Sequence, residues 1–230
     1  IYNVHTQKLN ANGVKQWGEN GNTIWTRDTK KVLAEIEKPQ NAAARVVIVS
    51  GRTIAQPESL FVAALNSSGQ LAGTAEFLSG GWTYDSYDQK AARIDEQKLA
   101  TIWSDNRSSL NRDMYYQIMD GNGTPLLEPD GRKLSVEGNF SIYAPPAIAA
   151  DGNGGAFFAW IGDSMGNGNT MHIHRIDGNG NQTWDTPATV RSLYGFHGQS
   201  YLISDDNGGV FAVFARFTDS FVARIGVAHV

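Results

Sequence analysis

The sequence predicts an all-β protein in which one four-stranded unit is repeated along the chain. The main observation is a glycine that recurs at Gly13, Gly69, Gly123 and Gly180. The intervals of 56, 54 and 57 residues give a period of about 55 residues. That period has the length of a propeller blade rather than of a helical repeat unit.

Each of these glycines is expected to close a tight turn. An Asn or Asp lies three residues before it, where the side chain can bond the backbone two residues on, and glycine takes the positive φ that a Cβ would penalise. Four residues after the glycine, a large apolar residue usually anchors the next strand. The Asx residues are Asn10, Asn66, Asp120 and Asp177, and the residues at the anchor position are Trp17, Leu127 and Trp184, with Gly73 as the exception.

A second turn motif lies half a repeat away. Residues 151–155 and 205–209 align without a gap and differ only at Gly152 and Asp206, and an apolar strand follows each. Short apolar, aromatic and β-branched runs between Gly/Asn/Asp turns are typical of antiparallel hairpins. We therefore predict one β-propeller-like domain over residues 1–230, with four to five blades of four antiparallel strands, or a piece of a larger array.

The strands follow the same order within each repeat. Residues 1–9 align with the third strand, as do residues 221–230, so the chain is expected to begin and end inside a blade. Residues 32–36 fit a helical turn or an innermost strand, and the repeat favours the strand; residues 76–87 fit a rim loop or an outer strand. The count is four first, four second and five third strands. The other strands are expected at 46–50, 59–65, 99–104, 113–119, 156–163, 171–176, 200–203 and 210–214, with dense turns at 125–138.

Composition limits the function classes. A net charge of −4 and a pI near 5.7 argue against a nucleic-acid surface, which needs a basic face. The chain has no cysteine, which leaves no disulfide or thiolate metal site. No apolar run approaches the ~18 residues of a membrane span. The chain begins with Ile1 rather than Met, so a processed or excised piece is expected.

Three segments resemble the repeat of large secreted bacterial β-propeller-like proteins, largely uncharacterised and often attached to the cell surface. They are Tyr116–Gly123, Trp103–Arg107 and Ala147–Gly155. The resemblance covers nearly the whole chain and implies a propeller fold and an extracellular or cell-surface location. It implies no specific activity, because the shared motifs are turn and packing motifs.

Two features suggest metals. His172 and His174 lie on one face of a strand, but Gln7 and Gln117 occupy the position of His174 in other repeats, which favours a hydrogen-bonding position. The Asp-Gly-Asn-Gly turns resemble fragments of calcium loops, but no Asp-x-Asp-x-Asp-Gly ladder accompanies them. We predict no metal and no cofactor, with calcium as the lesser alternative.

The variable loops after the second strands favour recognition. A non-catalytic module that binds a glycan or an extracellular protein is the main prediction, and replacing Asp105 and Arg107 by alanine is expected to abolish binding and leave the fold intact. A competing interpretation places Trp103 in the core between blades. The predicted ligand-binding residues are Arg52, Trp103, Asp105, Arg107 and Asp163.

Two alternatives remain. One is a structural repeat protein of the cell surface or of a filament. The other is a propeller-type glycoside hydrolase, which needs a pair of carboxylates. The chain is expected not to be an enzyme, because no repeat-breaking pair of acids stands out in the loops. The acids that could supply such a pair are Asp85, Asp88, Asp95, Asp105 and Asp163.

Overall fold

The fold is described from a computed structural model. Its backbone is described for residues 2–27, 31–37, 45–52, 58–73, 76–82, 87–105, 107, 113–134, 139–140, 145–163, 170–193, 195–217 and 222–230. Side chains are described for residues 3–26, 60–73, 89–105, 107, 113–134, 145–162, 170–193, 195–196, 198–217 and 222–230.

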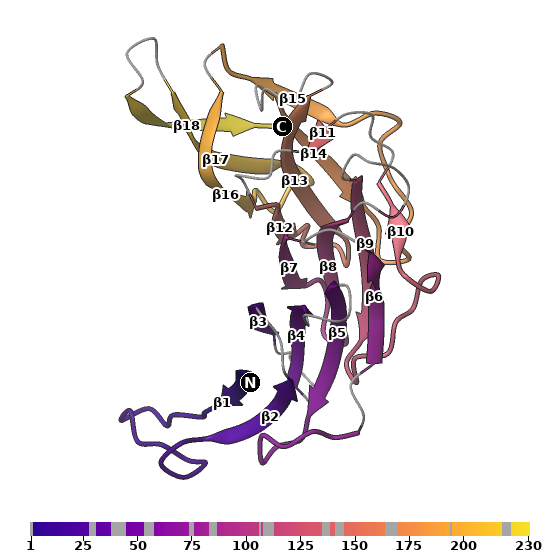
Figure 1. Cartoon of the computed structure of the whole chain (residues 1–230). Helices are drawn as coiled ribbons and strands as arrows, with labels where there is room; N and C mark the ends of the chain where they lie inside the picture. Colours follow the sequence, from indigo (N-terminus) through magenta and orange to yellow (C-terminus); the bar gives the residue numbers. More distant parts are fainter. Residues whose placement is uncertain are drawn as a thin grey trace.

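The described residues form antiparallel sheets that follow one another along an arc (Figure 1). No helix long and apolar enough to cross a membrane occurs in this part of the chain. The N-terminal half-blade contains β1 (Tyr2–Thr6) and β2 (Asn22–Arg27). Blade I contains β3 (Lys31–Glu37), β4 (Arg45–Arg52), β5 (Glu58–Leu65) and β6 (Glu76–Trp82). Blade II contains β7 (Tyr87–Arg93), β8 (Lys98–Asp105), β9 (Asp113–Asp120) and β10 (Arg132–Lys133). Blade III contains β12 (Ala147–Ala150), β13 (Ala156–Asp163), β14 (Thr170–Ile176) and β15 (Ala188–Arg191), with β11 (Asn139–Phe140) added to β13. The C-terminal blade contains β16 (Phe196–Ser204), β17 (Val210–Phe217) and β18 (Ala223–His229).

The order of strands confirms the predicted repeat. Residues 31–37 form a strand rather than a helical turn, and residues 76–82 form an outer strand. The first strands β3, β7, β12 and β16 lie on the concave side of the arc (Figure 1). Each is followed by a second strand, and β1, β5, β9, β14 and β18 are the third strands, so the expected four, four and five are present.

The four recurring glycines occupy equivalent turns, as predicted. In each turn the glycine N–H donates to the Asx carbonyl oxygen at 2.9–3.0 Å, and the Asx Oδ1 accepts two further backbone N–H groups. The turn thus satisfies its own backbone. The φ angles are +76° at Gly13, +76° at Gly69, +90° at Gly123 and +79° at Gly180.

The core lies between successive blades rather than inside one of them. In β8, Ala100 and Ile102 pack against blade III, whereas Leu99 and Trp103 pack against blade I. The alternation of side chains along a strand sends neighbours to opposite faces, so a strand covered on both sides is apolar throughout. Seven of the eight residues of β8 are accordingly buried.

The turn glycines also permit close packing between blades. A Cβ on Gly69 would lie 2.5 Å from the ring of Trp17, whereas nothing lies within 4 Å of a Cβ on Gly13. Both glycines have the same φ, so Gly13→Ala and Gly69→Ala share the backbone strain and differ in the clash. We expect Gly69→Ala to lower the free energy of unfolding by about 1–3 kcal/mol more than Gly13→Ala. Chemical denaturation measures the difference, and equal losses would contradict it.

Candidate functional site

The predicted ligand-binding residues lie at the ends of the second strands of three blades. Arg52 ends β4, Asp105 ends β8 and Asp163 ends β13, with Trp103 and Arg107 on either side of Asp105. Equivalent strands end at the same face of a propeller, so the five residues share one face. The described side chains include those of Trp103, Asp105 and Arg107, and these three form one cluster.

Asp105 is the centre of this cluster. Its carboxylate is 1% exposed and accepts a hydrogen bond from Trp103 Nε1 at 3.0 Å. Arg107 Nε donates to the same carboxylate at 2.9 Å and 3.0 Å, and Nη2 of Arg107 forms an ion pair with Oδ2. A buried carboxylate needs such charged and neutral donors, because an unpaired charge would be costly away from water.

Arg107 extends the cluster to the neighbouring turn. Its guanidinium lies over the ring of Tyr115, 3.8 Å from the centroid, and Nη1 donates to the carbonyl oxygen of Asp130 at 2.5 Å. Next to Asp130, a Cβ on Gly131 would lie 2.5 Å from the Trp103 ring, so the turn rests directly on the indole. The cluster therefore fastens the loop before β10 to the end of β8.

This geometry assigns the three residues a packing role. Trp103 and Asp105 are both 1% exposed, which agrees with the interpretation of Trp103 as a core residue between blades. The side chain of Arg107 is 12% exposed, and a ligand at this surface would meet Arg107 first. Ligand binding by these residues stays a prediction. The expectation that the double alanine substitution abolishes binding and leaves the fold intact also stays a prediction.

The position shared by His174 and two glutamines is a hydrogen-bonding position, as predicted. Gln117 Oε1 accepts from the N–H groups of Ile118 and Leu127 at 3.0 Å and 2.8 Å. His174 Nδ1 accepts from the N–H of Arg175 at 3.0 Å, and Nε2 lies 2.9 Å from Gln182 Oε1. Nε2 therefore carries the proton of a neutral ring, and burial lowers the pKa of His174.

The aspartates of the turn motifs also bind backbone. Asp151 and Asp205 each accept two backbone N–H groups through Oδ1 at 2.8 Å, and Asp151 forms an ion pair with Arg175 at 2.7 Å. Within the described ranges, no group of three or more His, Asp or Glu residues could hold a metal ion. The absence of a calcium requirement stays a prediction.

Of the five acids considered for glycoside hydrolysis, the side chains of Asp95 and Asp105 are among those described. Asp95 accepts the N–H groups of Gln97 and Lys98 in a turn, at 2.7 Å each, and Asp105 is buried in the cluster described above. Asp88 lies on β7, the innermost strand of blade II. The side chains of Asp85, Asp88 and Asp163 lie outside the described ones.

The fold is similar to that of carbohydrate-processing propellers. The chain superposes with a TM-score of 0.50 on an endo-arabinase from Bacteroides thetaiotaomicron, at 12% identity, over 86% of this chain and 74% of that chain. It superposes with a TM-score of 0.51 on the subtype N11 neuraminidase-like protein of A/flat-faced bat/Peru, at 13% identity, over 97% and 68%. An α-L-arabinofuranosidase from Lactobacillus brevis gives a TM-score of 0.46 at 11% identity, over 95% and 78%. No family model and no curated protein matches the sequence.

These comparisons confirm the β-propeller fold and correct one expectation. The expectation that the chain is not an enzyme is contradicted, because the chain shares its fold with a protein named as an endo-arabinase. The alternative of a propeller-type glycoside hydrolase agrees better with the likeness than the non-catalytic binding module.

The Asp105 cluster predicts a large effect on stability. Asp105→Ala leaves Arg107 without its carboxylate partner at a buried site, and we expect a loss of about 3–5 kcal/mol in the free energy of unfolding. The matched control is Glu128→Ala, which removes an exposed ion pair with Arg132 and should cost less than about 1 kcal/mol. Urea denaturation of both variants measures the contrast. Similar losses for the two variants would show that the cluster does not fasten the loop.

The lowered pKa of His174 predicts a pH dependence of stability. Below the ordinary histidine pKa of about 6.5, the unfolded chain binds a proton at this position and the folded chain does not until its lower pKa is reached. The contribution is therefore complete above pH 6.5 and declines as the pH falls below it. His174→Gln should flatten this dependence, because Gln117 occupies the equivalent position in blade II. Denaturation between pH 5 and 8 tests this, and an unchanged slope in the variant would contradict it.

Proposed function

We propose that this chain is the propeller of a glycoside hydrolase that acts on a glycan at the concave side of the ring. Two features support the proposal: the fold likeness to an endo-arabinase and a neuraminidase-like protein, and the acids carried by the innermost strands. The second feature belongs to this chain itself and carries the assignment.

The innermost strands of adjacent blades lie next to one another. β3 contacts β7, β7 contacts β12, and β12 contacts β16 (Figure 1). β3 carries Glu35 and Glu37, and β7 carries Asp88. β12 and β16 carry no acidic residue. The acids of the innermost strands thus come from two adjacent blades.

Glycoside hydrolysis uses two carboxyl groups on either side of the scissile bond. A separation of roughly 5–5.5 Å suits retention and roughly 6.5–9.5 Å suits inversion. Neighbouring strands at the narrow side of a ring are where side chains of different blades can meet at such separations. Our assignment gives the acid and base roles to two residues among Glu35, Glu37 and Asp88.

The test is release of reducing sugar from a panel of glycans that includes arabinan and sialylated oligosaccharides. We expect the wild-type protein to hydrolyse one class, and Glu35→Gln, Glu37→Gln or Asp88→Asn to lower kcat about 10²–10⁴-fold where the residue acts as acid or base. The control is Asp120→Asn, which keeps the turn because Asn10 and Asn66 occupy equivalent positions.

Full activity in all three acid variants would contradict the assignment of the site. Absence of hydrolysis across the panel by a folded wild-type protein would contradict the enzyme class. The extracellular location and the glycan partner stay predictions that accompany this proposal, and the resemblance of the repeat supports the location.

A further inference from the structure

The joints between blades follow one rule with one exception. The anchor residue four positions after a turn glycine lies on the turn glycine of the next blade. A Cβ on Gly69 would lie 2.5 Å from Trp17, and a Cβ on Gly180 would lie 2.7 Å from Leu127. At each joint the missing Cβ makes room for an apolar side chain.

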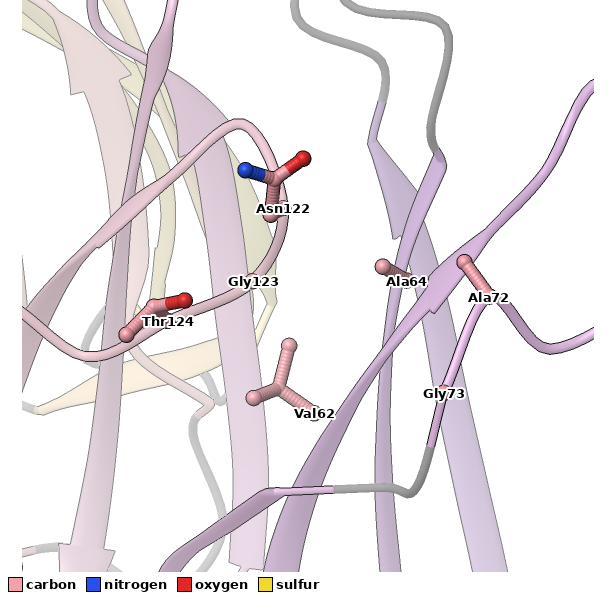
Figure 2. A pocket seen from close by; sticks show the side chains of 7 residues that line it. All are labelled: Val62, Ala64, Ala72, Gly73, Asn122, Gly123 and Thr124. Carbon is pink, nitrogen blue, oxygen red and sulfur yellow. The ribbon is translucent and has the colours of Figure 1, made fainter.

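The joint between blades I and II lacks this side chain. Gly73 occupies the anchor position, and a Cβ on Gly123 would meet only Val62, at 3.4 Å, and the edge of Ala64. A cavity of about 330 Å³ remains between Val62, Ala64 and Gly73 on one side and the 122–124 turn on the other (Figure 2). This volume is at the lower end of the range for small-molecule sites.

A second position of blade I is altered together with the anchor. In the N-terminal half-blade Gln7 Oε1 accepts the N–H of Trp17 at 3.0 Å, and in blade II Gln117 Oε1 accepts the N–H of Leu127 at 2.8 Å. The equivalent residue in blade I is Ala63. The glutamine that holds the anchor and the anchor itself are both replaced by small residues.

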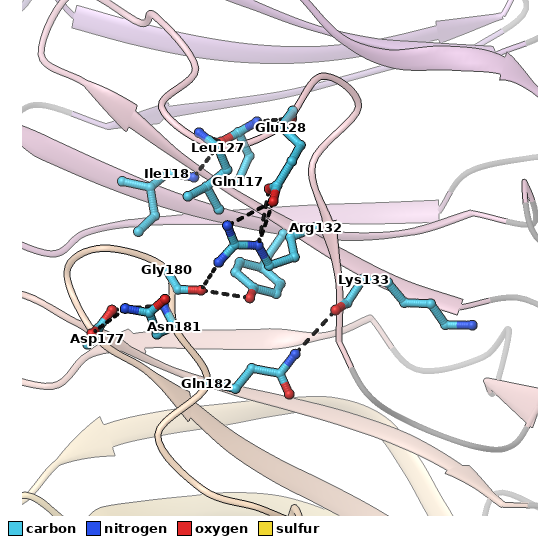
Figure 3. Close-up of polar contacts among 11 residues, drawn as sticks. Gln117, Ile118, Leu127, Glu128, Arg132, Lys133, Asp177, Gly180, Asn181 and Gln182 are labelled. Carbon is cyan, nitrogen blue, oxygen red and sulfur yellow. Dashed lines mark hydrogen bonds and ion pairs between the residues drawn. The ribbon is translucent and has the colours of Figure 1, made fainter.

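Polar contacts do not close the cavity. At the joint between blades II and III, Arg132 Nη1 and Tyr116 Oη both donate to the carbonyl oxygen of Gly180 at 2.8 Å (Figure 3). Lys98 Nζ donates to the carbonyl oxygen of Gly178 at 2.9 Å. Among the residues that the structure describes, blade I sends no such donor to the 122–124 turn. The cavity is open to solvent at the exposed side chains of Asn122 and Thr124.

The lining has two chemical parts. The wall formed by Val62 and Ala64 is apolar. The exposed side chains of Asn122 and Thr124 lie at the opposite side, and neither has a hydrogen-bond partner within the described part of the chain (Figure 2). At the preceding joint the same place holds the indole of Trp17. The geometry points to a binding site for one small planar aromatic molecule of indole size with a hydrogen-bonding edge.

Two physical arguments support this ligand class. A volume of about 150 Å³ is enough to hold benzene, so the open cavity of about 330 Å³ here has room for a fused ring. A sugar ring would need hydrogen-bond partners for several hydroxyl groups. The amide of Asn122 and the hydroxyl of Thr124 cannot supply them all. The site is separate from the innermost strands and does not depend on the proposed hydrolase activity.

The probe is indole, titrated into the whole chain and followed by NMR and by the melting temperature. We expect saturable one-site binding with shifts at Val62, Ala64 and Thr124, and a melting temperature that rises with indole concentration. Gly73→Trp should abolish the saturable shifts and raise the melting temperature without ligand. The backbone at Gly73 accepts a side chain, because nothing lies within 4 Å of its Cβ position and its φ is outside the left-handed region.

A second variant opens the equivalent site in another joint. Trp17→Gly should add a second indole site beside Gly69. A third variant, Gly73→Leu, places the side chain found at Leu127 in the first site and should block indole binding there, as Gly73→Trp does. No saturable binding to the wild type, or binding that Gly73→Trp and Gly73→Leu leave unchanged, would overturn the inference. Saturable shifts at the same residues with a monosaccharide and none with indole would show the ligand class to be wrong.

Discussion

The fold depends on the close approach of neighbouring blades, which at two joints brings an apolar side chain onto the turn glycine of the next blade. A positive φ and a missing Cβ allow an indole or an isobutyl group to lie directly on the backbone at Gly69 and Gly180. The Asx side chain of the same turn satisfies the backbone N–H groups, so the turn keeps its shape while the neighbour packs on it. Because each blade buries its faces only against its neighbours, this contact helps to fix the angle between blades at these two joints.

Several aspartates have a structural role that follows from their position in the repeat. At turn positions such as Asp95, Asp120 and Asp205, one carboxylate oxygen accepts hydrogen bonds from two backbone N–H groups. Asp105 is likewise occupied by Trp103 and Arg107. These acids are held by the fold, and protonating or moving them for catalysis would disturb a turn or a buried pair.

The sequence was sufficient for the repeat because turn chemistry is local. Glycine spacing and Asx positions predicted the equivalent turns, the strand order and the innermost strand at 31–37. The cluster around Asp105 could not be predicted in the same way. A Trp-x-Asp-x-Arg run at the end of a strand looks like an exposed binding loop, and its burial depends on Tyr115 and the 128–131 turn. Glu35 and Glu37 of β3 were likewise not among the candidate acids, because they lie in a Lys/Glu-rich segment of the sequence.

Departures from the repeat are concentrated in blade I. It has Ala63 where other repeats have glutamine or histidine, Gly73 where they have a large apolar anchor, and Glu35 and Glu37 on its innermost strand. Each blade packs against its neighbours through the same positions. A small residue at such a position therefore loses packing free energy. The loss is tolerated at the joint with blade II because Leu60 and Val62 still pack against Leu99 and Met119. Blade I can therefore keep an open cavity at its turn and carry acids on its innermost strand while its buried contacts hold it against blade II.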